Sequence, residues 1–159
     1  MTTLYLIRHG IAAERGTDAN DDDRPLTEKG QRRTRLVAER LAEMIQVELI
    51  LTSPLVRARQ TAEILRDRGV GDRLEVSPPL APGGSLQDWL LWLGQWHGGP
   101  LALVGHQPDL GNWAELLLWG RPHQRLEVKK AGVLGLRLPV NQPVGCSTLF
   151  WLTPPRLLI

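Results

Sequence analysis

Residues 3–10 read Thr-Leu-Tyr-Leu-Ile-Arg-His-Gly, so a mostly apolar run ends directly in an arginine, a histidine and a glycine. A short, continuous apolar run is typical of a strand that is buried on both faces, as in a parallel sheet. Ligands of open α/β sheets bind at the carboxyl ends of such strands. The stretch therefore predicts a buried first strand with Arg8 and His9 at the edge where a ligand would bind.

Strand-like and helix-like segments alternate along the rest of the chain. Further strands are expected at 47–51, 74–76 and 101–104, and three short ones follow at 125–130, 132–138 and 147–152. Helices are expected from Thr27, from Ser53-Pro54, from Ser85 and over 108–118, where a capping residue or a proline precedes apolar residues at helical spacing. This alternation predicts an α/β fold, a three-layer α/β/α sandwich with a mostly parallel central sheet and an antiparallel edge. Since no stretch is rich enough in Pro, Gly or Ser to divide the chain, residues 1–159 are expected to form one domain.

The composition of the 159 residues argues against several classes of protein. Nineteen basic residues against 17 acidic ones give a net charge of +2, which is too balanced for bulk nucleic-acid binding. No apolar run approaches the about 20 residues of a membrane span, and the first ten residues lack the pattern of a signal peptide. We therefore expect a cytoplasmic protein without membrane or nucleic-acid partners. Cys146, the single cysteine, permits no internal disulfide and is expected in the core, as are most of the six tryptophans.

Polar side chains follow three of the expected strands. Arg8 and His9 follow the first, Ser53 and Arg57 the second, and His106 the central one. A residue of any of these types, taken alone, commonly has a structural role or lies at the surface. Structural or surface roles do not, however, predict that all of them occur at successive strand ends. Two imidazoles and two guanidiniums at one edge of a sheet, beside the amino end of a helix, suit a phosphate dianion.

Three segments resemble the motifs of the histidine phosphatase superfamily, also called the phosphoglycerate-mutase-like superfamily. They are 6–10 (Leu-Ile-Arg-His-Gly), 52–62 (Thr-Ser-Pro-Leu-Val-Arg-Ala-Arg-Gln-Thr-Ala) and 103–106 (Leu-Val-Gly-His). The segments 24–27 (Arg-Pro-Leu-Thr), 105–109 (Gly-His-Gln-Pro-Asp) and 129–132 (Lys-Lys-Ala-Gly) are similar to those of SixA-type phosphohistidine phosphatases. The resemblance extends over most of the chain.

The resemblance implies a role for each matching residue. His9 matches the nucleophile that takes the phosphoryl group, Arg8 and Arg57 match the arginines that hold the phosphate oxygens, and His106 matches the second histidine of the phosphate pocket. Arg24 matches an arginine near the site in SixA-type members and is expected to bind substrate. A histidine nucleophile attacks through a neutral nitrogen, so its other ring nitrogen should donate to a fixed acceptor. No carboxylate cluster suits magnesium, so the arginines would supply the positive charge, and no metal or cofactor is expected.

The sequence singles out no proton donor for the leaving group. Acidic candidates are Asp18, Asp21 to Asp23, Asp88 and Asp109; the run at 21–23 is expected to be a solvated loop and Asp109 a first-turn helix residue. An alcohol, whose pKa is close to the ~15.7 of water, leaves poorly without a proton. Imidazole, whose conjugate acid has a pKa of roughly 6.5, can leave as a neutral ring. The missing donor therefore favours phosphohistidine over a sugar phosphate as the substrate.

Three functions remain open on the sequence. The first is a metal-independent phosphatase that acts on protein phosphohistidine, for example on a histidine-phosphotransfer domain of two-component signalling. The second is a phosphatase of small phosphomonoesters. The third is a phosphate-binding module without catalysis, against which the presence of both His9 and His106 counts. The first is favoured, with a phosphorylated protein as its partner and a monomer or a weak dimer as its state.

Overall fold

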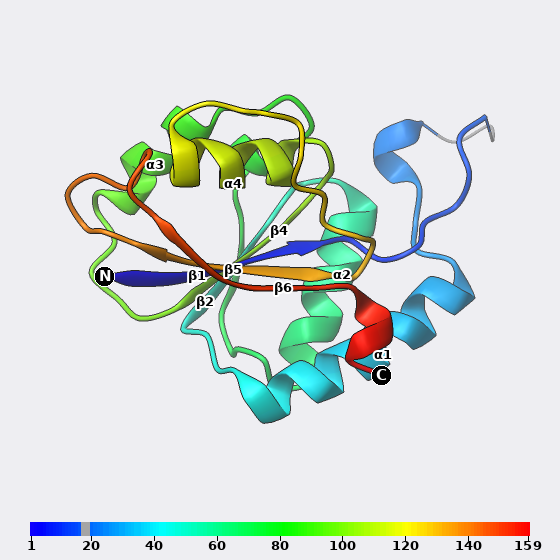
Figure 1. The fold of residues 1–159 in the computed structure, drawn as a ribbon. Coiled ribbons are helices and arrows are strands. Elements are labelled where there is room, and N and C mark those ends of the chain that lie inside the picture. The colour runs from blue at the N-terminus through cyan, green and yellow to red at the C-terminus, as the bar shows by residue number, and fades with distance from the viewer. Residues whose placement is uncertain (17–19) are drawn as a thin grey trace.

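A six-stranded sheet forms the middle layer of the protein, and helices cover both of its faces (Figure 1). The structure is a computed structural model that describes residues 1–16 and 20–159. The strands are β1 (Thr2–Arg8), β2 (Leu49–Thr52), β3 (Leu74–Val76), β4 (Leu101–Gly105), β5 (Val133–Leu138) and β6 (Thr148–Thr153). The helices are α1 (Glu28–Met44), α2 (Val56–Asp67), α3 (Leu86–Leu93) and α4 (Asp109–Trp119), with short 3-10 turns η1 (Asp21–Asp23), η2 (Pro78–Leu80) and η3 (Pro155–Leu157). Within the described ranges, no helix is long and apolar enough to cross a membrane.

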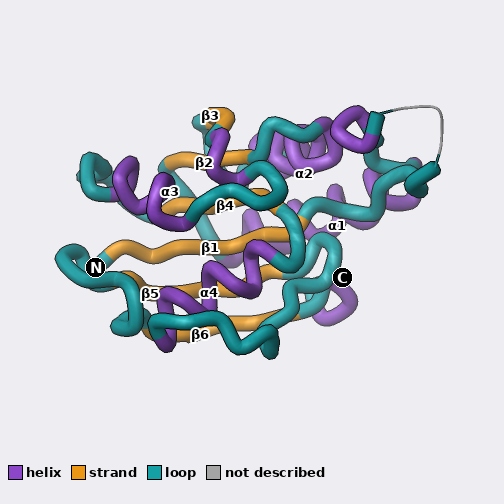
Figure 2. The backbone as a smooth tube through the Cα atoms, turned by 90° about the horizontal axis from the view of Figure 1, so that it is seen from above, coloured by secondary structure: helices purple, strands orange, loops and turns teal. Residues whose placement is uncertain are grey.

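The first strand of the chain, β1, lies near the centre of the sheet. The strand order is β3-β2-β4-β1-β5-β6 (Figure 2). β1 pairs in parallel with β4 and antiparallel with β5, so Leu4 lies between Leu101 and Leu136. β2 is parallel to both β3 and β4, whereas β5 and β6 are antiparallel. The predicted three-layer α/β/α sandwich, with a mostly parallel sheet and an antiparallel edge, is confirmed.

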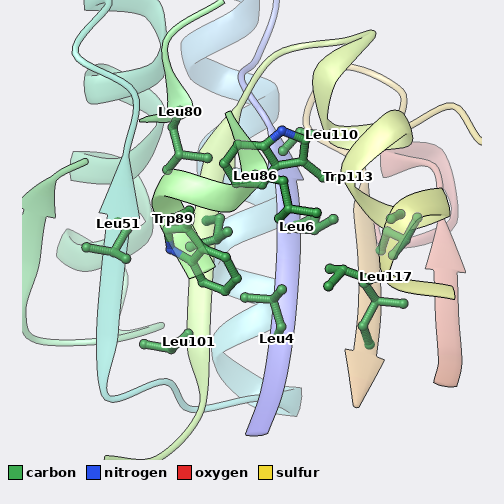
Figure 3. Close-up of a cluster of buried hydrophobic side chains, with 14 of the residues drawn as sticks. Leu4, Leu6, Leu51, Leu80, Leu86, Trp89, Leu101, Leu110, Trp113 and Leu117 are labelled. Carbon is green, nitrogen blue, oxygen red and sulfur yellow. The ribbon is translucent and has the colours of Figure 1, made fainter. Parts of the chain in front are cut away.

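Alternate residues of β1 serve the two faces of the sheet. Leu4 and Leu6 contact the layer of α3 and α4, where Trp89 is fully buried and lies beside Trp113 (Figure 3). Ile7 belongs to the second apolar cluster, which α1 and α2 build on the opposite face. Because both faces of β1 are covered, its sequence is apolar without alternation, as expected for a central strand.

The helix starts predicted at Thr27 and Ser85 are confirmed. The hydroxyl of Thr27 accepts the backbone N–H of Gly30 at 2.9 Å, and that of Ser85 accepts the N–H of Asp88 at 3.4 Å. The start predicted for the second helix is wrong, because α2 begins at Val56 and is preceded by Leu55, which gives no side-chain cap.

The strand predicted at 125–130 is wrong, since this segment forms a loop. Glu115 of α4 is fully buried, and its carboxylate accepts the backbone N–H groups of Arg125 and Leu126 at 2.7 and 2.9 Å. The side-chain oxygen of Gln107 accepts the N–H of Val128 at 3.3 Å. Side chains thus satisfy the backbone donors that a neighbouring strand would otherwise have to pair.

The burial predicted for Cys146 is wrong, and Trp119 is an exposed exception among the tryptophans, most of which were expected in the core. Trp119, the last residue of α4, is 52% exposed, and Cys146 is exposed in the connection between β5 and β6. Gly120, in the left-handed conformation, ends α4 directly after Trp119. The N–H of Cys146 donates to the carbonyl of Pro143 at 3.2 Å. Both residues therefore lie where the chain turns at the surface rather than in a layer that faces the sheet.

Candidate active site

The carboxyl ends of three parallel strands lie side by side. Arg8 of β1 is paired with Gly105 of β4, and the N–H of His9 donates to the carbonyl of Gly105 at 3.1 Å. Ser53 follows β2, and its N–H donates to the carbonyl of Val104 at 2.9 Å. The polar residues that follow these strands therefore meet at one edge of the sheet, where open α/β sheets bind their ligands.

A cleft of about 230 Å³ opens at this edge. Its lining residues come from the carboxyl ends of β1 and β4, from α2, from the connection between β1 and α1, and from the segments that follow η2 and precede β5. They are Arg8, His9, Ala12, Arg15, Asp21, Arg24, Arg57, Pro82, His106, Gln107 and Lys130. The structure thus brings together all five residues that the sequence marked as candidates: Arg8, His9, Arg24, Arg57 and His106. The charged side chains of the cleft lining are four arginines, Lys130 and Asp21, so the cleft has an excess of positive charge and suits an anion.

His9 is buried, with 7% of its surface exposed, and its ring is held in one orientation. Its Nδ1 lies 2.7 Å from the carbonyl oxygen of Gly10, which can only accept a hydrogen bond. Nδ1 therefore carries the proton, and Nε2 keeps its lone pair. Burial lowers the pKa of His9 to about 3; the hydrogen bond to Gly10 opposes this, and the nearby His106 and arginines reinforce it. The ring is neutral near pH 7, as an attacking nitrogen requires.

His106 lies beside His9, with 5.2 Å between the ring centroids. Its Nε2 is 2.8 Å from the hydroxyl oxygen of Ser53. This hydroxyl also accepts the N–H of Leu55 at 3.2 Å, so Ser53 supports His106 at the turn before α2 instead of capping the helix. Burial and then Arg57 lower the pKa of His106 to about 4.

Arg8, at the end of β1, and Arg57, in the first turn of α2, both line the cleft. One terminal nitrogen of Arg8 donates to the carbonyl of Val128 at 3.3 Å. Arg57 is 3% exposed, and it donates to the backbone carbonyl of Asp21 at 2.9 Å. Burial lowers the pKa of both guanidiniums, although both remain charged near pH 7. Each arginine is thus fixed by a backbone carbonyl and keeps further N–H donors for a ligand.

Three buried polar atoms in this group have no hydrogen-bond partner within the described residues. They are Nε of Arg8, Nε of Arg57 and Nδ1 of His106. Buried polar groups are nearly always paired, so unpaired ones that gather at one place indicate a site that completes them with a ligand. Two guanidinium donors and an imidazole nitrogen around one cleft match the oxygens of a tetrahedral anion.

Arg24 lines the cleft, but much of its hydrogen-bonding capacity is used within the chain. Its Nε donates to Asp21 Oδ1 at 2.8 Å, and one terminal nitrogen donates to the carbonyl of Ala13 at 2.6 Å. Asp21 also lies 3.5 Å from a terminal nitrogen of Arg57 and 3.6 Å from Arg15. Desolvation raises the pKa of the Asp21 carboxyl, but Arg24, Arg57 and Arg15 outweigh it and hold this pKa below its ordinary value.

Among the acidic candidates that the sequence left open and the structure describes, Asp21 is the one that lies at the cleft. Residues 21–23 are exposed, as expected for a solvated segment. The turn η1 also brings Asp21 to the cleft, where it is the one carboxyl group among the described lining residues. Asp109 is the first residue of α4, as predicted, and accepts the N–H of Gly83 at 2.8 Å. Asp88 lies in the first turn of α3, and Asp18 lies outside the described residues.

Three further residues line the cleft, and no role was predicted for them from the sequence: Arg15, Gln107 and Lys130. Lys130 stands next to Ala131, which has a φ of 61° and whose N–H contacts the carbonyls of Arg8 and His9 at 3.0 and 3.2 Å. This turn places Lys130 beside the carboxyl end of β1. The signal in the sequence that could have marked Lys130 is the Lys-Lys-Ala-Gly segment at 129–132. Over the described parts of the chain, no group of His, Cys, Asp or Glu is arranged to hold a metal ion.

Comparisons with known proteins bear on this geometry. The family model of the histidine phosphatase superfamily (branch 1) matches residues 4–81. An uncharacterized protein of Picosynechococcus sp. is 51% identical over 98% of both chains. The phosphohistidine phosphatase SixA of Escherichia coli is 38% identical over 85 residues, which are 52% of each chain.

A solved structure extends the similarity to SixA over the whole chain. The protein histidine phosphatase SixA complexed with tungstate superposes with a TM-score of 0.85 at 28% identity, over 99% of this chain and 100% of the other. The same family is indicated by the motifs at the three strand ends, by the fold and by these relatives. The chain therefore belongs to the histidine phosphatase superfamily, and its activity is that of a phosphatase.

Proposed function

We propose that this protein is a metal-independent phosphatase that removes the phosphoryl group from phosphohistidine in proteins. The observation that carries the proposal is the set of unpartnered buried nitrogens of Arg8, Arg57 and His106 around the neutral ring of His9. The similarity to a SixA structure that holds tungstate, a tetrahedral oxyanion, supports it. The inferred substrate is a histidine-phosphotransfer domain of a two-component system, which would place the protein in the cytoplasm.

Two successive displacements at phosphorus account for the reaction. In the first, the lone pair of His9 Nε2 forms a bond to phosphorus while the bond from phosphorus to the substrate imidazole breaks. The substrate ring leaves as a neutral imidazole when its other nitrogen carries a proton. In the second, water attacks the phosphorus, His9 leaves as a neutral ring, and the water proton passes to phosphate. Nδ1–H of His9 keeps its bond to the carbonyl of Gly10 throughout.

Arg8, Arg57 and His106 stabilise the charge in both steps. Phosphoryl transfer spreads negative charge over three equatorial oxygens, and guanidinium forks can each hold two of them. A bound dianion also favours the protonated form of His106 and so raises its pKa from the low value of the ligand-free site. Positive side chains thus do the work that magnesium does in other phosphoryl-transfer enzymes.

The carboxyl group of the cleft supports phosphohistidine over an alkyl phosphate. An alkoxide leaving group needs a proton donor, and Asp21 is a poor one because its arginine neighbours lower its pKa. An imidazole leaving group has a conjugate acid of pKa roughly 6.5 and needs no strong acid. The same environment therefore disfavours small phosphomonoesters as substrates.

The substrate preference can be measured directly. We expect the purified protein, with a chelator present, to hydrolyse free phosphohistidine and a phosphorylated histidine-phosphotransfer domain far faster than a panel of sugar phosphates. His9→Ala should lose at least about 10³-fold in kcat, because the nucleophile is gone. An alkaline quench during turnover should trap phosphate on His9 of the wild type.

Two results would refute the proposal. One is a preference for a sugar phosphate over phosphohistidine, which would transfer the role of proton donor to Asp21 or another acid. The other is equal turnover of phosphohistidine by the wild type and His9→Ala. His97→Ala, which changes an exposed histidine outside the cleft, is the matched control and should retain full activity.

A further inference from the structure

A second cavity, of about 500 Å³, lies beside the end of β6 and α1. We call it the β6 groove. Its apolar part comes from Leu152, Pro154 and Pro155. Three basic side chains and one acidic side chain border it: Arg33, Lys129, Arg156 and Glu127. Leu152 is 43% exposed, although it lies within a strand. An apolar hollow with a charged border is the usual composition of a protein-binding surface.

The β6 groove is close to the catalytic cleft. Thr153, which lines the groove, is paired with Val133 of β5, and Val133 is paired with Ile7 of β1. Neighbouring strands are about 4.8 Å apart, so Thr153 lies roughly 10 Å from the residue that precedes Arg8. In Figure 2, the C-terminal turn η3 and the carboxyl end of β1 lie on the same side of the molecule.

A single segment of chain forms a wall of both cavities. Lys129 lines the groove and Lys130 lines the cleft. The carbonyl of Val128, one residue earlier, accepts the hydrogen bond from Arg8. A molecule bound in the groove would therefore lie against the segment that supports the catalytic arginine.

The charge of the border indicates what the groove binds. Lys129 is paired with Glu127 at 3.4 Å, and both side chains are more than half exposed. Arg33 and Arg156 form no ion pair with any described residue, so the border has an excess of positive charge. The cleft adds Arg15 and Lys130 on the neighbouring surface. Such a surface favours a partner with apolar and acidic side chains next to one another.

We propose that the β6 groove binds an acidic amphipathic helix of the phosphoprotein substrate and so presents its phosphohistidine to His9. This inference rests on the proposed function. Apolar side chains of that helix contact Leu152 and Pro155, and its carboxylates pair with Arg33 and Arg156. The roughly 10 Å between Thr153 of the groove and Ile7, two residues before His9, corresponds to about seven residues, or two turns, of a helix that rises 1.5 Å per residue.

Two phosphohistidine peptides test the proposal. They share one helix-forming sequence, with leucines at the apolar positions about two turns from the phosphohistidine, and differ in having Glu or Lys at the polar positions. We expect wild-type kcat/KM to be about tenfold higher for the Glu peptide than for the Lys peptide at low salt, mainly through KM. The preference should decrease as salt screens the charges.

The double variant Arg33→Glu/Arg156→Glu should reverse this preference and leave the turnover of free phosphohistidine unchanged. Arg32→Glu is the matched control, because Arg32 is an exposed residue of the same helix that does not line the groove. It should keep the wild-type preference. Thermal unfolding of each variant checks that the fold is retained.

The possible failures are distinguishable. If wild type does not hydrolyse free phosphohistidine, the proposed function is wrong. If it hydrolyses free phosphohistidine but treats both peptides alike, or if the double variant behaves as Arg32→Glu does, the groove does not bind the substrate and the present inference is overturned.

Discussion

His9 and His106 are buried side by side, and this burial sets their chemistry. Water is largely excluded from both rings, so the charged form is disfavoured, and the neighbouring guanidiniums disfavour it further. The carbonyl of Gly10 then selects which nitrogen of His9 keeps the lone pair. In the proposed reaction, His9 can therefore act as the nucleophile because of its position, without a general base to activate it.

The same burial predicts that ligand-free protein loses stability in acid. In the unfolded chain both rings have a pKa near 6.5, whereas in the folded protein the values are about 3 for His9 and about 4 for His106. Between about pH 6.5 and 4 the unfolded chain binds more protons than the folded protein does. The free energy of unfolding therefore decreases as the pH is lowered, by up to about 1.4 kcal/mol per pH unit for each ring. Urea unfolding at pH 7 and at pH 4.5 measures this decline.

A histidine variant separates this effect from that of the carboxyl groups. His106→Asn should show a smaller decline between the two pH values, because asparagine does not titrate. The exposed His97→Asn should decline as the wild type does. If His106→Asn loses as much stability in acid as wild type, the low pKa of the buried ring is wrong.

At the scale of elements, the connection between α4 and β5 is held by side chains. Glu115 accepts backbone N–H groups from His123, Arg125 and Leu126, and these bonds lower its pKa against the effect of burial. Val128 lies farther along the same connection, and its carbonyl accepts the hydrogen bond from Arg8. A buried residue of a helix therefore fixes a loop that in turn fixes an arginine of the cleft.

Glu115→Gln tests this link. The amide nitrogen of glutamine would face backbone N–H groups that now have a carboxylate oxygen, so the variant should lose about 1–3 kcal/mol of unfolding free energy. KM for phosphohistidine should rise as the loop and Arg8 shift. Urea unfolding and steady-state kinetics measure the two effects. Glu63→Gln, at an exposed position of α2, should change neither, and a fully stable Glu115→Gln would contradict the role of the carboxylate.

At the scale of the whole molecule, two apolar layers fix the sheet that carries the cleft. Trp89 is fully buried over the sheet, with the rings of Trp92 and Trp113 at 6.2 and 6.0 Å. This layer lies on the face of β1 that Leu4 and Leu6 occupy (Figure 3). The positions of the strand ends, and therefore of the side chains that line the cleft, depend on this packing.

Trp89→Ala should lower the free energy of unfolding by about 3–5 kcal/mol, because it leaves a large cavity in the layer. Trp119→Ala, which changes the half-exposed tryptophan at the end of α4, should cost less than about 1 kcal/mol. Denaturant unfolding of the two variants gives the comparison. Similar losses would mean that the tryptophan layer of α3 does not carry the stability assigned to it.

The sequence by itself determined the class of the fold and the candidate residues of the cleft. The run at 3–7 has the apolar pattern of a central strand, Thr27 and Ser85 cap helices through their own local bonds, and the motifs lie directly after strands. These features depend on residues close together in the chain. Parallel strands then bring their carboxyl ends to one edge, so Arg8, His9 and His106 were expected to meet.

Only the tertiary structure decided which partner each polar group takes. The carboxylate of Glu115 accepts backbone N–H groups of the segment 125–130, whose sequence predicts a strand. Ser53 contacts His106 instead of capping α2. The turn η1 brings Asp21 to the arginines of the cleft. Glu115 and Arg125 are 10 residues apart in the chain, and Ser53 and His106 are 53 residues apart. Asp21 and Arg24 are only 3 residues apart, but they too meet through the turn of η1. Because a hydrogen bond goes to whichever group the packed layers place within reach, such choices are fixed by three-dimensional proximity and leave no periodic pattern in the sequence.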